Sequence, residues 1–250
     1  MEIIAVCNQK GGCAKTTTAV NLAASLADLN KKVLLIDNDP QGNLTGSIGV
    51  NEYKNTILDC LVNDLSIGEA VVKSNFDNID ILAADINYAN AELALANVKN
   101  KEYLLKEAFE RSKLDYDYIL IDCSPSLSLT TINALVAANS ILIPLEPSIF
   151  NLEGLAQLIK ILRLVMDNLN KKLEIKGVLL TRVDTRSNLP KQFEEQLHEI
   201  FGDKLFNTMI HQSISVVRSQ IEKKPLLYYE RWGKSSREYI ALAKEVAKRG

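Results

Sequence analysis

Six short, almost continuously apolar segments recur along this chain, and segments with helical periodicity separate them. They cover residues 3–7, 33–36, 79–82, 118–121, 141–145 and 177–180. Strands that are apolar on both faces are typical of a parallel sheet covered by helices on each side. The alternation therefore predicts an α/β fold with a doubly wound, mostly parallel sheet flanked by helices. In such sheets, ligands bind at the carboxyl ends of the strands.

The composition fits a single domain over residues 1–250, because 47% of the residues are hydrophobic and 24% are charged. We expect a cytoplasmic protein, since neither a signal peptide nor an apolar run of about 18 residues is apparent. The formal net charge of −2 means that any nucleic-acid-binding surface must be local. Cys7, Cys13, Cys60 and Cys123 lack the spacing of a metal or disulfide pair, so buried thiols are predicted.

A glycine-rich segment, NQKGGCAKTT at residues 8–17, lies between the first predicted strand and a helical segment. Gly11 and Gly12 allow backbone N–H groups to turn inward, and the helix that follows adds its positive N-terminal end. Lys15 is placed to neutralise the β- and γ-phosphates of a nucleotide, and the Thr16 hydroxyl to bind Mg²⁺. The alternative is an ordinary glycine turn that caps a helix. The strand–loop–helix context favours a phosphate-binding loop.

The loop differs from the ordinary Walker A pattern because Gln9 replaces its first glycine and Lys10 adds a second lysine. Lys10 comes five residues before Lys15, on the far side of the loop. One phosphate group hardly needs two lysines from the same loop. We therefore expect Lys10 to reach the nucleotide of a facing subunit, which predicts a homodimer built around its nucleotides.

Three aspartates follow two of the predicted strands. Asp37 and Asp39 are two residues apart on an extended chain, so their side chains are expected to point together toward the γ-phosphate and the metal. Asp122 follows the run 118–121 and is placed to hold Mg²⁺ through water. A helix cap or a turn is the alternative for each aspartate. Three of them at strand ends beside a phosphate loop favour metal and water chemistry.

At these residues the chain resembles the deviant Walker A family of P-loop NTPases, whose pattern is KGGxxKT. Within that family it resembles the ParA/Soj chromosome and plasmid partition ATPases. The resemblance extends over most of the chain and follows the family's order, in residues 8–27, 33–43, 118–135, 141–158 and 179–189. Several matching segments in one order are far more specific than the loop alone.

The resemblance implies that the chain is a weak ATPase that uses ATP and Mg²⁺. The implied nucleotide-binding residues are Lys10, Gly11, Gly12, Cys13, Ala14, Lys15, Thr16, Thr17 and, near the adenine, Asp184. Lys10, Lys15 and Asp39 are the implied catalytic residues, with Asp39 positioning the attacking water. Asp37 and Asp122 join Thr16 at the magnesium site. No arginine finger is apparent, so slow hydrolysis stimulated by a ParB-like partner is expected.

One position of the loop departs from the family, because Ala14 stands where glycine is usual, immediately before Lys15. If the backbone there needs a positive φ, the added Cβ costs on the order of 1 kcal/mol. We therefore expect altered nucleotide affinity or turnover, with the site itself retained.

The carboxyl-terminal segment separates charge from the rest of the chain. From Arg218 onward there are nine basic and four acidic residues, a balance of +5 that leaves −7 for the remainder. ParA/Soj proteins bind double-stranded DNA nonspecifically as ATP dimers, and the resemblance implies the same here, with nucleoid association. The DNA-binding candidates are Arg218, Lys223, Lys224 and Arg237. The alternative is a solvated helix face with ion pairs.

Three aromatic residues in the same segment, Tyr228, Tyr229 and Trp232, have two readings. They are able to stack on nucleic-acid bases, but packing in the core is favoured.

Two other classes of protein use the same loop. A MinD-like membrane-associated positioning ATPase needs an amphipathic carboxyl-terminal helix with bulky apolar residues. Residues 237–250 are alanine-rich instead, which favours a packed helix and no membrane contact. A metabolic or redox enzyme related to the nitrogenase iron protein needs paired cysteines at a dimer face. Cys123 follows Asp122, but no companion cysteine has that context.

Overall fold

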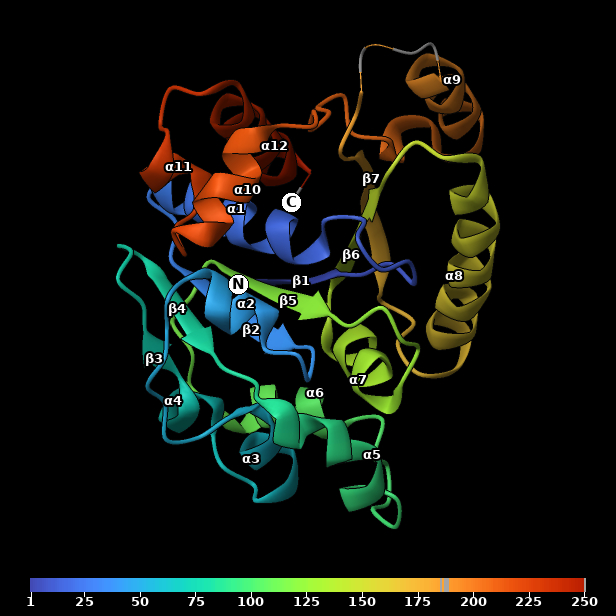
Figure 1. The fold of residues 1–250 in the computed structure, drawn as a ribbon. Helices are drawn as coiled ribbons and strands as arrows, with labels where there is room; N and C mark the ends of the chain where they lie inside the picture. Colours follow the sequence, from blue (N-terminus) through green and yellow to red (C-terminus); the bar gives the residue numbers. More distant parts are fainter. Residues whose placement is uncertain (185, 187–188, 250) are drawn as a thin grey trace.

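The computed structural model describes residues 1–184, 186 and 189–249, which form one seven-stranded sheet with helices on both faces (Figure 1). The strands are β1 (Glu2–Val6), β2 (Val33–Asn38), β3 (Val72–Lys73), β4 (Ile79–Leu82), β5 (Tyr118–Cys123), β6 (Ser140–Leu145) and β7 (Glu174–Leu180). Their order in the sheet is β3-β4-β2-β5-β1-β6-β7. Each neighbouring pair is parallel except β3 with β4. The predicted fold class is thus confirmed.

The helices cover both faces of the sheet. On one face lie α1 (Lys15–Asp28), α2 (Asn43–Ser47), α10 (Ile214–Ile221), α11 (Leu226–Tyr229) and α12 (Lys234–Lys248). On the other face lie α3 (Ile57–Val62), α4 (Ile67–Ala70), η1 (Ile86–Asn90), α5 (Ala91–Ala94), α6 (Leu104–Arg111) and α7 (Leu129–Ala137). Beside β7 lie α8 (Ile149–Asn168), α9 (Leu189–Phe201) and η2 (Gly202–Lys204).

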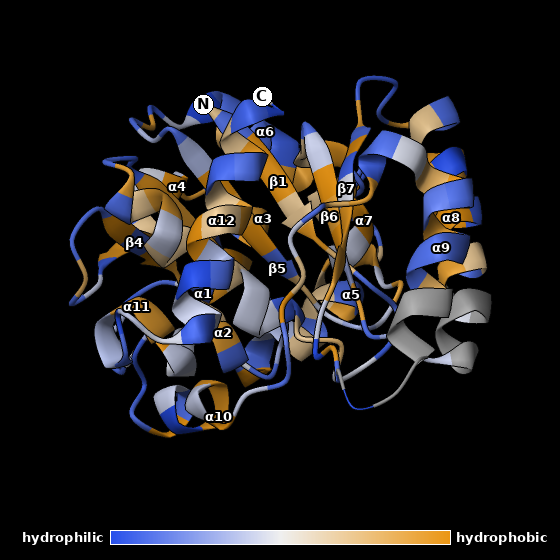
Figure 2. Cartoon of the chain, turned by 90° about the horizontal axis from the view of Figure 1, so that it is seen from above, coloured by the Kyte–Doolittle hydropathy of each residue, from blue (hydrophilic) through white to orange (hydrophobic). Residues whose placement is uncertain are grey.

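Two hydrophobic clusters lie on opposite faces of the sheet, and every strand except β3 contributes to both. In β1, Ile3 and Ala5 belong to the cluster under α3, α6 and α7, whereas Ile4 and Val6 belong to the cluster under α1 and α12. Successive side chains of a strand point to opposite faces, so a strand covered on both sides is apolar at every position. Figure 2 shows hydrophobic residues concentrated in the strands at the centre of the molecule.

The last helix, α12, packs against α1 (Figure 1). Tyr239, Leu242 and Val246 are buried and recur at helical spacing, in the same cluster as Leu22 of α1. The expected packed helix near the carboxyl end is confirmed. No helix in the described parts of the chain has the length and apolar character needed to span a membrane.

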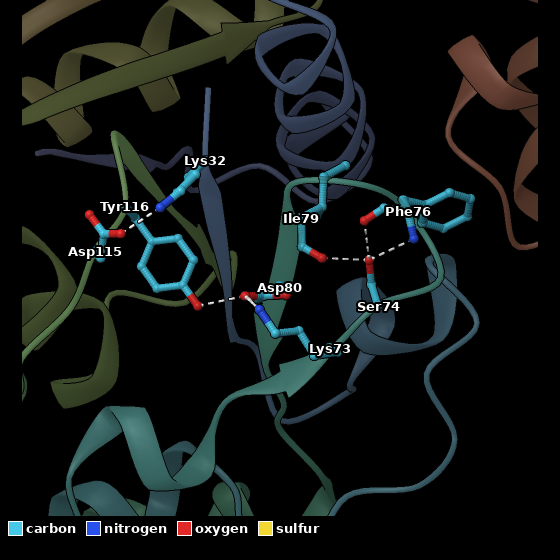
Figure 3. A network of polar contacts seen from close by, with 8 residues as sticks. All are labelled: Lys32, Lys73, Ser74, Phe76, Ile79, Asp80, Asp115 and Tyr116. Atoms are coloured by element: carbon cyan, nitrogen blue, oxygen red, sulfur yellow. Dashed lines mark hydrogen bonds and ion pairs between the residues drawn. The ribbon is translucent and has the colours of Figure 1, made fainter. Parts of the chain in front are cut away.

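The strand β3 was not predicted from the sequence. It is two residues long and pairs antiparallel with β4 at the edge of the sheet. Figure 3 shows the polar contacts there: Asp80 of β4 accepts hydrogen bonds from Lys73 Nζ (2.7 Å) and from the Tyr116 hydroxyl (2.7 Å). These contacts lie away from the loop that follows β1.

Candidate functional site

The glycine-rich loop connects the carboxyl end of β1 to α1. Its two lysines differ in environment, because Lys15 is buried, with 7% of its surface exposed, whereas Lys10 is exposed. The Lys15 ammonium donates a hydrogen bond to the Lys10 carbonyl oxygen (3.1 Å), which folds its side chain back under the loop. A buried ammonium is held at the floor of the loop while the second lysine remains free to reach outward.

The backbone of the loop turns through two residues with positive φ. Gly12 has a φ of 78° and Ala14 a φ of 65°, with Ala14 forming the cap position immediately before α1. The sequence predicted a steric cost at Ala14 on the condition that the backbone there has a positive φ, and the structure shows that it does. An alanine in this conformation carries a steric cost that glycine does not.

Residues that follow β7 support the loop from the side. The Thr181 hydroxyl donates to the Cys13 carbonyl oxygen (3.2 Å), and Arg182 Nη1 donates to the Gly12 carbonyl oxygen (3.1 Å). Sequence reasoning missed both contacts because the partners are separated by 168 and 170 residues. No local pattern signals such a pairing.

A threonine and an aspartate meet at the start of α1. The Thr16 hydroxyl donates to Asp122 Oδ2 (2.6 Å), while the buried Asp122 Oδ1 has no hydrogen-bond partner among the described residues. Burial is the largest cause that raises the pKa of the Asp122 carboxyl, and the negative charge of Asp37 is the second. A buried carboxylate oxygen without a donor is costly unless a cation or water satisfies it. The pair therefore fits a cation site.

This cation site is not a cage of protein ligands. Within the described ranges, no three His, Cys, Asp or Glu side chains come together as a metal-binding group. Mg²⁺ binds through one or two protein oxygens, with waters and substrate phosphates filling the other positions. The chemistry at Thr16 and Asp122 suits that kind of ion.

Asp37 and Asp39 lie in different environments. The Asp37 carboxylate is fully buried and accepts hydrogen bonds from the Thr45 N–H (2.8 Å) and the Thr45 hydroxyl (2.7 Å). Burial raises the pKa of Asp37 to about 6. Asp39 is half-buried and lines the cavity described next, whereas Asp37 does not. Asp39 is therefore the one of the two that the structure places at the cavity, and the expectation that both carboxylates face the γ-phosphate and the metal stays a prediction.

A cavity of about 1190 Å³ opens above the loop. Its floor is formed by the loop and the start of α1 (Gly11, Gly12, Ala14, Lys15, Thr16 and Thr17). Its walls include Asp39, Ala89 and the segment 124–126, together with Thr181, Arg182 and residues of α10. Gln220 of α10 donates to the Thr17 hydroxyl (2.9 Å), which joins α10 to the start of α1. Its size and lining suit a small organic phosphate.

Asp184, predicted near the adenine, does not line this cavity among the residues described. Its carboxylate is bound by Arg186, whose Nη2 lies 2.7 Å from Asp184 Oδ2, and this bond lowers the pKa of Asp184 to about 2. Thr181 and Arg182, which precede it, do reach the cavity. The adenine role of Asp184 stays a prediction.

The basic residues predicted to bind DNA lie at the surface. Arg218, Lys223, Lys224 and Arg237 are all exposed, three of them on or beside α10. Lys224 lies 3.8 Å from Glu222, an exposed pair of the kind that contributes little to stability. These side chains are accessible to an anionic partner.

The favoured prediction for the neighbouring aromatic residues was wrong. Trp232 is 79% exposed, and Tyr228 and Tyr229 are 43% and 36% exposed. The Arg231 guanidinium lies 5.5 Å from the centre of the Trp232 ring and is anchored by Asp28 of α1 (2.7 Å). Trp232 is therefore presented to solvent beside a basic side chain.

The thiol prediction is confirmed, since all four cysteines are free and buried.

Comparison with known proteins identifies the family. A family model described as an AAA domain matches residues 1–175. The chain is 43% identical over 251 residues to the sporulation initiation inhibitor protein Soj of Bacillus subtilis, covering 100% of this chain and 99% of Soj. The chain belongs to the Soj/ParA family. It is also 38% identical over 253 residues to the chromosome partitioning protein ParA of Caulobacter vibrioides, covering 100% of this chain and 95% of ParA.

This Soj/ParA protein also has the fold of a solved enzyme structure. Cobyrinic acid a,c-diamide synthase from Mycobacterium smegmatis, with bound ADP and magnesium, superposes with a TM-score of 0.85 at 30% identity. The match covers 97% of this chain and 92% of that structure. The Soj/ParA chain therefore shares its fold with a protein that holds a nucleotide and Mg²⁺.

Proposed function

We propose that this chain is an ATP-dependent dimerising switch ATPase that binds DNA nonspecifically. It acts in chromosome or plasmid partitioning, associated with the nucleoid, together with a ParB-like stimulating partner. The observation that carries the proposal is the contrast between the two loop lysines, with Lys15 buried under the loop and Lys10 exposed. An ordinary phosphate loop needs a lysine at the position of Lys15. We assign Lys10 to the nucleotide of a partner subunit.

The nucleotide is ATP, bound in the cavity above the loop. The loop N–H groups and the N-terminal end of α1 hold the phosphates, and Lys15 neutralises their charge. Thr16 and Asp122 hold Mg²⁺, and the unpaired Asp122 Oδ1 supports this assignment. Bound Mg²⁺ supplies charge neutralisation at the β- and γ-phosphates. Asp184 remains a candidate for the adenine end, with Thr181 and Arg182 lining the cavity nearby.

Hydrolysis depends on positioning a water molecule. Asp39 lines the cavity at the end of β2, where its carboxylate orients the attacking water toward the γ-phosphate. The proposed role of Asp37 is to organise the metal site from behind, through the Thr45 contacts that fix it. Positioning alone gives slow turnover, so basal activity is weak and the partner protein raises it.

Dimerisation brings Lys10 of each subunit to the nucleotide of the other. An exposed ammonium at the edge of a phosphate site adds positive charge where charge develops during phosphoryl transfer. Dimerisation also doubles the basic surface around Arg218, Lys223, Lys224 and Arg237. Two such surfaces side by side bind DNA more tightly than one, because each phosphate contact adds to the affinity.

Two alternative functions make different predictions. For a MinD-like membrane role, α12 would have to release an apolar face that Tyr239, Leu242 and Val246 now bury against α1. Co-sedimentation with liposomes in the presence of ATP tests that role. A metabolic enzyme on the same scaffold would bind nucleotide without binding DNA.

The decisive experiment is a DNA mobility-shift assay with ATP, with ADP and without nucleotide. We expect DNA binding by the wild-type protein with ATP only. Lys10→Ala should abolish it because the dimer cannot close, and Asp39→Ala should prolong it because ATP persists. Lys15→Ala should abolish both nucleotide and DNA binding. Lys113→Ala is the control for charge loss, because it removes an exposed lysine between α6 and β5, at the amino ends of the strands.

The assay also has a clear negative outcome. Equal DNA binding in all three nucleotide states, unchanged by Lys10→Ala, would contradict the switch. Nucleotide binding with no DNA binding in any state would favour a metabolic enzyme instead.

A further inference from the structure

Asn38 is the last residue of β2 and lies between the two aspartates of the site. Its side chain is fully buried. Because side chains alternate along a strand, Asn38 points to the face opposite Asp37. Asp37 is held by Thr45 of α2, and Asn38 contacts Thr130 of α7 on the other side of the sheet. The chain at Asp39 is thus anchored from both faces immediately before it leaves the strand.

The amide of Asn38 is satisfied by two separate elements. Its Nδ2 donates to the Thr130 carbonyl oxygen (3.1 Å), and its Oδ1 accepts the Tyr88 hydroxyl proton (2.6 Å). Tyr88 lies in η1 and is only 1% exposed, within the hydrophobic cluster of that face. Burying an amide and a phenol there is costly unless each polar atom is paired. The Tyr88 hydroxyl is the group that satisfies Asn38 Oδ1.

This contact joins three parts of the cavity wall. Asp39 follows Asn38 directly, and Ala89 follows Tyr88 directly; both line the cavity. The segment 124–126, which also lines it, leads into α7 and Thr130. One buried amide therefore links the ends of β2, η1 and α7 where they surround the nucleotide site.

The hydrogen bonds of Asp39 itself lie within its own turn. Its Oδ1 accepts the Gln41 N–H (3.0 Å), and its N–H donates to Asp37 Oδ1 (3.3 Å). These local bonds shape the turn, but they do not fix where the turn lies relative to the phosphate loop. That placement depends on how the end of β2 is held. Its backbone pairs with β5 as far as Cys123, and the Asn38 side chain ties it in addition to η1 and α7.

We propose that Tyr88 is a positioning residue for ATP hydrolysis, acting through Asn38 on Asp39. Its hydroxyl holds the Asn38 amide, which sets the position of the Asp39 carboxylate over the γ-phosphate. Tyr88 itself is not among the described residues that line the cavity. The proposal rests on the ATPase function proposed above. An ordinary core would have an apolar pair at these two buried positions. The proposal gives the polar pair Tyr88 and Asn38 a role in the chemical step instead.

The expected effect follows from the sensitivity of positioned catalysis to small displacements. A shift of about 1 Å in a catalytic group lowers a rate up to about a hundredfold. Tyr88→Phe removes only the hydroxyl and allows a fraction of that shift. We expect kcat for ATP hydrolysis to fall about tenfold, with KM for ATP changed less than about twofold, because the phosphate loop is untouched.

The matched control is Tyr116→Phe. The Tyr116 hydroxyl donates to the buried Asp80 (2.7 Å; Figure 3), and neither residue lines the cavity. Both variants lose one tyrosine hydroxyl and one hydrogen bond to a side chain in the sheet. Tm from thermal unfolding and circular dichroism report whether each variant folds. If both substitutions lower Tm to a similar extent and only Tyr88→Phe lowers kcat, the loss of kcat comes from positioning and not from lost stability.

A double-mutant cycle tests whether Tyr88 acts through Asn38. Wild type, Tyr88→Phe, Asn38→Leu and the double variant are compared for kcat, for KM and for the affinity of a fluorescent ATP analogue. We expect Tyr88→Phe to cause no further loss of kcat in the Asn38→Leu background. If Tyr88→Phe does not fold, Tyr88→Leu with Asn38→Leu replaces it, since both polar partners are then removed together.

Each outcome decides between the two proposals. A wild-type protein that hydrolyses ATP while Tyr88→Phe matches Tyr116→Phe in kcat overturns the positioning role and leaves the ATPase function standing. An equal loss of kcat in both backgrounds also overturns it, because Tyr88 would then not act through Asn38. A wild-type protein without ATP hydrolysis overturns both.

Discussion

The backbone at Ala14 adopts a φ of 65° at the cap of α1, a conformation that glycine adopts without steric cost. Ala14→Gly removes the Cβ strain but adds conformational freedom to the unfolded chain. Strain at a left-handed residue costs about 1–2 kcal/mol, so we expect a net gain of about 0.5–1 kcal/mol in the free energy of unfolding. Urea unfolding with linear extrapolation measures it.

The control for that substitution is Ala241→Gly. Ala241 is exposed in the middle of α12, where glycine destabilises a helix by about 0.5–1 kcal/mol. The two substitutions should therefore act in opposite directions. A loss of stability in Ala14→Gly comparable with that in Ala241→Gly would show that the left-handed conformation imposes no strain.

Individual residues of the site were predictable when their role depends on local sequence. Lys15, Thr16 and Asp122 were singled out from their positions after strands and in the loop, and the structure places them near one another, while their roles stay predictions. The Thr45 contact to Asp37 was not predictable, because it depends on where α2 packs against the sheet. The same is true of Arg182, which supports the loop from a residue 170 positions away.

At the scale of single elements, α12 has a testable packing role. Leu242 is fully buried against α1, so Leu242→Ala should lower the free energy of unfolding by about 2–5 kcal/mol through lost burial and a cavity. Chemical denaturation measures the loss. Lys244→Ala, an exposed position on the same helix, should change stability by less than about 0.5 kcal/mol. A small effect of Leu242→Ala would mean that α12 is not docked in solution.

The turn between α11 and α12 carries a built-in fluorescent probe. Trp232 is the one tryptophan of the chain and is 79% exposed, so its emission should resemble that of free tryptophan in water. Acrylamide should quench it almost as strongly in the native as in the unfolded protein. Under the proposed function, DNA should change this emission with ATP and not with ADP. A blue-shifted, weakly quenched emission would contradict the exposed placement.

Prediction at the element scale succeeded where a pattern extends over several residues. All six apolar runs are strands, because continuous apolar sequence between helical segments has few other structures in an α/β chain. The edge strand β3 was missed because two residues carry no periodicity. The aromatic cluster at Tyr228, Tyr229 and Trp232 was misjudged because hydrophobicity alone does not tell which way a short turn faces.

For the whole molecule, nucleotide binding and folding are linked. A ligand that binds the native state stabilises it by about 2.7 kcal/mol at one hundred times its Kd. For a domain of this size, that raises Tm by roughly 5–10 °C, at 2–4 °C for each kcal/mol. We expect Mg·ATP to produce this shift in differential scanning fluorimetry, and Lys15→Ala to abolish it. An equal shift in Lys15→Ala would mean that ATP binds outside the loop.

The position of β1 in the sheet has a consequence for synthesis on the ribosome. β1 pairs with β5 and β6, whose residues lie at 118–123 and 140–145. The first strand and the loop after it therefore have no sheet partner until β5 has been made, about 115 residues after β1, and no second partner until β6 has followed. At about 5–20 residues per second, β1 stays without a sheet partner for roughly 6–23 seconds. During that interval an apolar strand is unpaired, so a chaperone that shields nascent apolar segments should raise the yield of folded protein.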